Sequence, residues 1–248
     1  MRARTSSRAA LIVRSSCSSM VPLQQQPAGA GKARQRDSVS ARRKLLAAAR
    51  RLPPRYTRTG ARLPPVFLMS DPDRTPDLPE LVAALPRGWG VIYRHFGADD
   101  RFETGARLAR ICRRRRLTLL VSADPDLALR TGADGVHWPE TRLHLRRPRL
   151  FGARRIIETA AVHSRSALRR AAQAGVDAAI VSTVFESGSP SASVPIGPER
   201  FRRLARTAPL PVFALGGITA NNAGRLVMQT HGRFAGWAAV GSIADAWA

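Results

Sequence analysis

Eight short apolar runs separated by helical segments are the feature that most limits how this chain can fold. The runs cover residues 66–69, 90–93, 117–121, 135–137, 156–162, 178–185, 211–215 and 236–240. Their hydrophobicity is continuous rather than alternating, which is typical of strands covered on both faces, as in parallel sheets. Segments such as 164–175 and 197–208 carry an apolar stripe at helical spacing. The alternation predicts an α/β fold, a compact (β/α)8 TIM barrel, with an open doubly wound sheet as the alternative.

Residues 1–62 differ from the remainder in charge and composition. They hold thirteen arginines, two lysines and one acidic residue, Asp37, so over half of the net charge of +24 lies in a quarter of the chain. We predict a basic, low-complexity, mostly disordered tail with a short helix at 41–52, followed by the barrel at 63–248. An inert tail, or an extension upstream of the true start, is favoured over a transit peptide or a nucleic-acid arm. Nucleic acid is therefore not expected as a partner.

The sequence also bears on compartment and redox chemistry. No apolar run is long enough to cross a bilayer, so no membrane association is expected. The two cysteines, Cys17 and Cys112, offer neither a disulfide framework nor the spacing of a metal site. We expect a cytoplasmic protein, and the sequence leaves its pairing into homo-oligomers open.

A glycine turn at the seventh run suggests an anion site. The stretch FALGGITANN (213–222) ends an apolar run at Gly216 and Gly217, just before a helix start. The eighth run ends similarly, at Gly241 and Ser242. In (β/α)8 barrels, phosphate often binds at the loops after strands seven and eight, where bare amides and helix N-termini favour an anion. We predict that these four residues form a phosphate cup; the alternative is two ordinary turns.

The same motifs carry a family resemblance. GADGVH (132–137), AVHS (161–164), STVFESGSP (182–190), PVFALGGITANNAGRL (211–226) and the closing AAVGSI resemble the thiamine phosphate synthase and TenI family in order and spacing. The resemblance implies a (β/α)8 barrel. It also implies one of two activities. The synthases join hydroxymethylpyrimidine diphosphate to a thiazole phosphate with Mg²⁺, whereas the TenI branch isomerises a thiazole carboxylate phosphate without a metal, using a histidine.

Departures from the synthase pattern decide between these expectations. Where the synthases have a glutamine and a diphosphate-binding lysine, this chain has Ile92 and Phe96, although Arg94 is retained. Ala123 and Arg142 occupy the positions at which the synthases have their two metal-binding aspartates. Pro190 replaces a loop lysine, and residues 63–248 contain no lysine at all, which excludes a Schiff base or a lysine–diphosphate clamp there. No metal site is predicted, and Mg²⁺ is expected only if the chain is a synthase that recruits Asp124 or Glu140.

Histidines and one arginine are the candidate reacting groups. His163 follows the fifth run and matches the histidine of the TenI branch; imidazole titrates near neutral pH and suits a proton shift. Arg94 is the expected partner of a substrate carboxylate, or else forms a salt bridge with Glu140 or Glu186. Ser187, Ser189 and His137 are expected to contact the substrate or to play structural roles. His95 adds a third histidine at the rim, but no metal motif is complete.

The favoured hypothesis is a metal-independent, TenI-like tautomerase whose substrate is a small phosphorylated thiazole and whose proton carrier is His163. The first alternative is a divergent thiamine phosphate synthase. The second is a catalytically inactive barrel that binds a phosphorylated ligand, and the third is a nucleic-acid binder that acts through residues 1–62.

Overall fold

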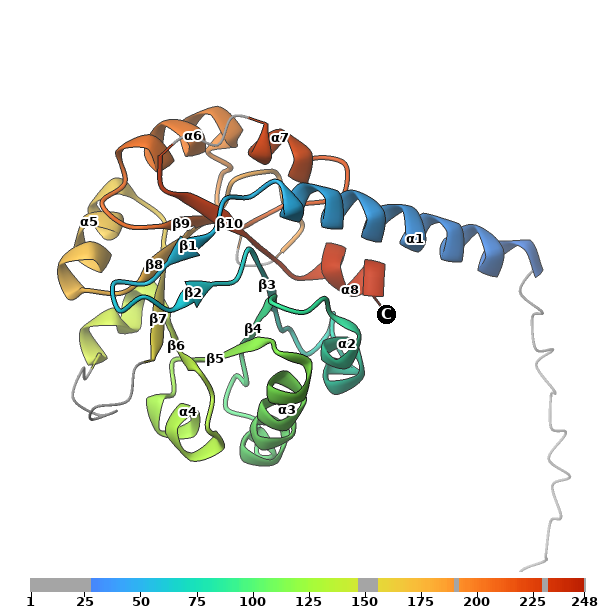
Figure 1. Ribbon diagram of the computed structural model, residues 1–248, viewed down its shortest axis with the longest axis horizontal. Helices are drawn as coiled ribbons and strands as arrows, with labels where there is room; N and C mark the ends of the chain where they lie inside the picture. The colour runs from blue at the N-terminus through green and yellow to red at the C-terminus, as the bar shows by residue number, and fades with distance from the viewer. Residues whose placement is uncertain (1–27, 147–155, 190–191, 229–231, 248) are drawn as a thin grey trace, which may run out of the picture.

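The chain folds into a closed barrel of eight parallel strands. The computed structural model describes residues 28–146, 156–189, 192–228 and 232–247. The strands are joined in the order β10–β3–β4–β5–β6–β7–β8–β9, and the first and last of them pair to close the barrel (Figure 1). Their bounds are β3 (Val66–Met69), β4 (Gly90–Tyr93), β5 (Thr118–Ser122), β6 (Gly135–Trp138), β7 (Ile157–Val162), β8 (Ala178–Val181), β9 (Val212–Ala214) and β10 (Phe234–Ala239). The predicted (β/α)8 TIM barrel is confirmed.

Helices follow the strands around the outside of the barrel (Figure 1). They are α2 (Leu78–Ala84), α3 (Arg101–Arg115), α4 (Pro125–Thr131), the 3₁₀ helix η1 (Glu140–Leu145), α5 (Arg165–Ala174), α6 (Gly197–Thr207), α7 (Ala223–Val227) and α8 (Gly241–Trp247). Side chains cap two of them: Ser164 accepts a hydrogen bond from the amide of Ala167, and Asp124 accepts one from Leu127. Within the described part of the chain, no helix is both long and apolar enough to span a membrane.

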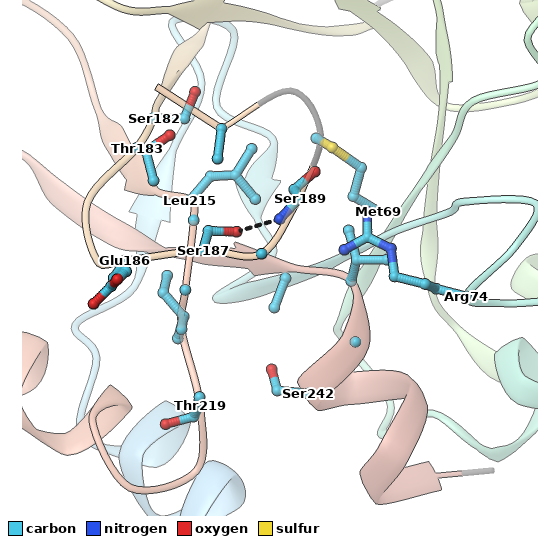
Figure 2. Close-up of a pocket in the computed structure, with 18 of the residues that line it drawn as sticks. Met69, Arg74, Ser182, Thr183, Glu186, Ser187, Ser189, Leu215, Thr219 and Ser242 are labelled. Carbon is cyan, nitrogen blue, oxygen red and sulfur yellow. Dashed lines mark hydrogen bonds between the residues drawn. The ribbon is translucent and has the colours of Figure 1, made fainter. Parts of the chain in front are cut away.

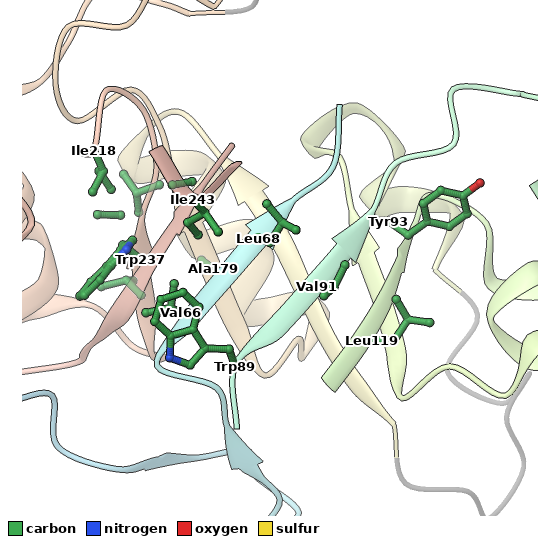
Figure 3. Close-up of a cluster of buried hydrophobic side chains, with 14 of the residues drawn as sticks. Val66, Leu68, Trp89, Val91, Tyr93, Leu119, Ala179, Ile218, Trp237 and Ile243 are labelled. Carbon is green, nitrogen blue, oxygen red and sulfur yellow. The ribbon is translucent and has the colours of Figure 1, made fainter. Parts of the chain in front are cut away.

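Strand side chains alternate between two buried clusters. Residues such as Phe67, Ile92 and Phe213 point into the barrel, where the rings of Phe67 and Phe213 meet edge to face at 5.3 Å. Their neighbours, such as Val91, point outward against the helices (Figure 3). Burial on both faces explains why each strand reads as a continuous apolar run.

The sixth apolar run, 178–185, was predicted to be a strand over its whole length. In the structure the strand β8 ends at Val181. The apolar residues that follow belong to a loop bonded to the end of β9. The amides of Val184 and Phe185 donate to the carbonyls of Leu215 and Gly216, at 2.9 and 3.0 Å. Their hydrophobicity reflects packing of this loop against the turn after β9.

Residues 28–62 contain more secondary structure than the short helix expected at 41–52. They form α1 (Ala28–Arg50) and a small antiparallel hairpin, β1 (Arg55–Tyr56) with β2 (Arg62–Leu63). Leu45 on α1 is wholly buried, and Leu63 joins the cluster inside the barrel. Helix α1 runs along α7 and α8 (Figure 1). Helix α1 is stabilised by tertiary packing of a short apolar stripe. The many arginines around that stripe make it hard to recognise in the sequence. Residues 1–27 of the predicted tail lie outside the described residues.

One polar pair lies within the barrel wall. His137 on β6 is buried, and its Nδ1 forms a 2.9 Å hydrogen bond with Oγ1 of Thr159 on β7. Burial, and secondarily the charge of Arg94, lower the pKa of His137 to about 3. The ring is therefore neutral at neutral pH and lies inside the barrel, which agrees with the structural role that was one of the two expected for it.

We predict that Leu45→Ala lowers the free energy of unfolding by about 2–5 kcal/mol, because it removes a fully buried side chain between α1 and the barrel. Val39→Ala on the same helix is the matched control; its side chain is 58% exposed, so a change within about 0.5 kcal/mol is expected. Urea denaturation measures both. Equal stability of the two variants would mean that α1 does not pack as the structure has it.

We predict that His137 makes the fold acid-sensitive. Its pKa is lower when folded than when unfolded, so the unfolded chain binds the extra proton and stability falls as the pH drops below about 6.5. This one group contributes a slope of at most about 1.4 kcal/mol per pH unit. Urea denaturation between pH 7 and 4 should show a steeper loss for the natural chain than for His137→Gln. Parallel curves for the two proteins would contradict this.

Candidate functional site

A cavity of about 350 Å³ opens at the carboxyl ends of the strands (Figure 2). Its lining comes mainly from the segments that follow β8, β9 and β10. Met69 and Arg74 lie across from Thr183 and Glu186 (Figure 2), and Arg94 also lines the cavity. The structure brings seven of the nine predicted site residues to this cavity: Arg94, Ser187, Ser189, Gly216, Gly217, Gly241 and Ser242. The two that it does not bring there are His137 and His163.

The turn after β9 requires its two glycines. Gly216 and Gly217 have φ values of +100° and +61°, in the region that side chains disfavour. A Cβ on Gly216 would lie 2.5 Å from Thr183 Cγ2, and one on Gly217 would lie 2.0 Å from the carbonyl oxygen of Glu186. Neither amide donates to another described residue. Two N–H groups without a described partner therefore lie in the turn that lines the cavity. The turn also packs closely against the loop after β8, at Thr183 and Glu186.

Ser242 provides an unpaired donor on the neighbouring segment. Its Oγ is buried and has no hydrogen-bond partner among the described residues, although the residue lines the cavity (Figure 2). A buried hydroxyl without a partner is destabilising and uncommon in proteins. An anion with oxygen acceptors would give this hydroxyl a partner.

The loop after β8 forms the rim of the cavity. Its two predicted serines are only partly exposed, and the amide of Ser189 donates to Oγ of Ser187 at 3.3 Å (Figure 2). Both hydroxyls therefore lie at the entrance, on the loop that also contacts Gly217. Pro190, which stands at the synthases' lysine position, lies outside the described residues.

Arg94 is paired with a carboxylate that the sequence did not single out. Its Nη2 donates to Oδ2 of Asp71 at 3.1 Å, and its Nε donates to the carbonyl of Ser70 at 2.6 Å. Arg74 donates to the same oxygen of Asp71 at 2.9 Å. Hydrogen bonding and the charge of Arg74, assisted by Arg94, lower the pKa of Asp71 against the opposing effect of burial. Two guanidinium groups thus bond to the same carboxylate oxygen beside the cavity.

The expected alternative partners of Arg94 were Glu140 and Glu186, and neither bonds to it. Glu186 is an exposed residue on the rim, and Glu140 lies with His163. The loop SDPDR after β3, with Asp71 and Arg74, was the signal available in the sequence. It is a charged loop at the end of a strand, on the face where barrel sites form.

His163 lies in two depressions beside the main cavity. Glu140 Oε2 accepts hydrogen bonds from the backbone amide of His163 at 3.0 Å and from its Nδ1 at 2.8 Å. The other oxygen of Glu140 accepts one from Arg170 at 2.8 Å. Because the carboxylate holds the proton on Nδ1, the neutral ring leaves Nε2 free to accept a proton. One depression also includes Ser182, which is the one lining residue that it shares with the main cavity.

His95 forms a separate group with Asp124. Its Nε2 lies 3.6 Å from Oδ2 of Asp124, and its Nδ1 accepts the amide of Gly97. Burial lowers the pKa of His95, although Asp124 opposes the shift. Asp124 also caps α4, so both residues already have structural partners.

The described residues at the mouth do not fit Mg²⁺. In the described ranges, no three His, Cys, Asp or Glu side chains converge as metal ligands. The carboxylates that we considered for recruitment, Asp124 and Glu140, are engaged by helix N–H, histidine or arginine partners. Ile92 points into the barrel core, whereas Phe96 is 65% exposed and lies 5.0 Å beneath the guanidinium of Arg94. The synthases' diphosphate and metal ligands are thus replaced by groups that do not coordinate a cation.

Comparison with known proteins agrees with this architecture. A family profile described as Thiamine monophosphate synthase matches residues 67–243. The chain is 33% identical over 160 residues to the thiamine-phosphate synthase of Thiobacillus denitrificans, covering 63% of this chain and 76% of that protein. It is 34% identical over 179 residues to the thiamine-phosphate synthase of Thioalkalivibrio sulfidiphilus, covering 69% and 84%.

A solved structure gives the same fold. Thiamine phosphate pyrophosphorylase from Pyrococcus furiosus superposes with a TM-score of 0.57 at 20% identity, covering 74% of this chain and 93% of that chain. The profile match spans the strands and loops that build the cavity, from β3 to the start of α8. The chain therefore belongs to the thiamine phosphate synthase and TenI family.

Proposed function

We propose that this protein acts on a phosphorylated thiazole in thiamine biosynthesis and holds the phosphate on Gly216, Gly217, Gly241 and Ser242. The observation that carries the proposal is the buried, unpaired hydroxyl of Ser242 beside a glycine turn with unpaired amides. Phosphate oxygens accept several hydrogen bonds at once and would provide partners for these donors. Family membership supplies the chemical class of the substrate.

The opposite wall favours a substrate with a second anionic group. Arg94 and Arg74 share Asp71, and among the described residues no second carboxylate bonds to either guanidinium. A substrate carboxylate would be that second partner. Glu186 and Asp245 also line the cavity, but both residues are exposed, so solvent and salt screen their repulsion of an anion. A thiazole carboxylate phosphate, with an anion at each end, matches this arrangement.

The reaction that we favour is the metal-independent isomerisation of that compound to its aromatic tautomer. In this reaction, Nε2 of His163 removes a proton from one ring position, and the protonated imidazole returns a proton to another. Glu140 fixes the orientation and tautomer of the imidazole through Nδ1. The substrate ring would have to extend from the cup past Ser182 to reach His163, because Ser182 borders both spaces.

A synthase is the second candidate, and the names of the relatives favour it: two that are 33% and 34% identical are thiamine-phosphate synthases. The substitutions at Ile92, Phe96, Ala123 and Arg142 weigh against it, because that reaction needs a metal–diphosphate site. A barrel that binds the ligand without turnover is the third candidate. Metal dependence and turnover separate the three.

We predict that Ser242→Ala weakens binding of a thiazole phosphate by roughly ten- to a hundredfold, since a hydrogen bond to a charged group is lost. The free energy of unfolding should stay the same or rise, because the lost hydroxyl has no partner in the free protein. Calorimetric titration and urea denaturation measure the two effects. Ser166→Ala is the control for affinity, which should not change; this residue is exposed at the start of α5, where its hydroxyl meets that of Ser164 at 2.9 Å. Unchanged affinity in Ser242→Ala would remove Ser242 from the cup.

We predict that the full chain binds thiazole carboxylate phosphate equally well with and without Mg²⁺, and that His163→Ala lowers turnover by about a hundredfold or more while leaving affinity within a few-fold. His144→Ala, another exposed histidine, is the control. Calorimetry and a tautomer assay by ultraviolet absorption check these results. Binding that requires Mg²⁺ would favour the synthase. Undiminished turnover in His163→Ala would refute the role of His163, and binding without any turnover would indicate the inactive barrel.

A further inference from the structure

Helix α1 lies outside the segment that matches the family, residues 67–243, and packs against the two helices that follow the turns of the cup. Helix α7 comes after the turn at Gly216–Asn222, and α8 begins at Gly241. Figure 1 shows α1 lying between these two helices. We propose that α1 positions the phosphate cup and that Lys44 is its positioning residue. The inference rests on the proposed function for its ligand, although not for the contacts described next.

The first contact fixes α8. Nε of Arg42 donates to the carbonyl of Ala246 in the last turn of α8, and the guanidinium lies 5.9 Å from the ring of Trp247. Leu45 is fully buried in the same cluster as Ile243. Helix α8 is only seven residues long, and helices this short depend on tertiary packing. The placement of Ser242 therefore depends on α1.

The second contact fixes the turn after β9. Nζ of Lys44 donates to Oδ1 of Asn221 at 2.8 Å. The next residue, Asn222, closes the turn from within: its Nδ2 donates to the carbonyl of Gly217 at 2.8 Å, and its Oδ1 accepts the amide of Thr219 at 2.8 Å. One side chain of α1 is thus joined, through two consecutive asparagines, to the backbone of Gly217.

A glycine turn needs such support. Glycine has the largest conformational freedom of any residue, so a site made of glycine amides is weakened if the turn fluctuates. The loop after β8 blocks movement of Gly217 on the barrel side, where a Cβ would lie 2.0 Å from Glu186 O. Lys44 acts from the outer side through Asn221. Anion affinity then depends on a helix that makes no contact with the anion.

The test compares Lys44→Met with Arg43→Met in the full chain. Both residues are exposed on α1 and each substitution removes one positive charge, but no hydrogen bond or ion pair of Arg43 occurs among the described residues. The probes are inorganic phosphate, titrated by calorimetry, and amide hydrogen exchange at Thr219. Lys44→Met should weaken phosphate binding roughly three- to tenfold and speed exchange at Thr219. Arg43→Met should do neither, and both melting temperatures should match that of the natural chain.

A double-variant cycle identifies the partner. Asn221→Ala should reproduce the effect of Lys44→Met, and the double variant should show no further loss, because the two side chains act through one contact. Unchanged phosphate affinity and unchanged Thr219 exchange in Lys44→Met would overturn the proposal. If the natural chain binds no phosphate while Lys44→Met still speeds Thr219 exchange, the phosphate cup is refuted and the positioning of the turn by α1 stands.

Discussion

Closure of the sheet between β10 and β3 is the constraint on which the other features of this molecule depend. Trp237, Ala238 and Ala239 pair in parallel with Val66, Phe67 and Leu68, so no strand is left at an edge. A closed parallel barrel directs the carboxyl ends of all its strands to one face. The turns after β9 and β10 therefore become neighbours, although 25 residues separate Gly216 from Gly241. Closure of the barrel thus brings the glycine turns at Gly216–Gly217 and at Gly241 to the same cavity.

The barrel strands were predictable because burial on both faces leaves an unbroken apolar run. The interpretation failed where apolar residues serve another purpose. Val184 and Phe185 extend the run of β8 in the sequence, but they bond to the end of β9 as a loop. Helix α1 was predicted only in part, over 41–52, for the opposite reason: here apolar residues are too few to show the whole helix. Its buried side, with Leu45 and Ala48, is narrow, and the surrounding arginines and serines give the composition of a disordered segment.

The glycine turn of the candidate site could be predicted from the sequence, because it depends on backbone conformation. The ion pairs and hydrogen bonds between its side chains could not. Glycines at the end of an apolar run indicate a turn, so the turn after β9 could be identified from the sequence. The partner of Arg94 could not, because Asp71 is 23 residues away and two glutamates seemed equally suitable. His137 was expected either to contact the substrate or to play a structural role, and the sequence could not decide between them; the structure buries it beside Thr159 in the interior. That Ser242 lacks a partner is visible only in three dimensions.

The imbalance between basic and acidic residues explains why the two walls of the cavity differ. The chain has 41 basic and 17 acidic residues, so arginines outnumber the carboxylates that can orient them. At the mouth, Asp71 holds two arginines, and Glu140 holds Arg170 together with His163. A carboxylate already bonded to a guanidinium is a poor ligand for a divalent cation, because binding the cation would break the existing pair. The proposed phosphate cup includes no carboxylate, because its donors would be amides and a hydroxyl. Under the proposed function, this arginine-rich chain therefore keeps a glycine turn and a serine for a phosphate, whereas the carboxylates Asp71 and Glu140 are already bonded to arginine or histidine.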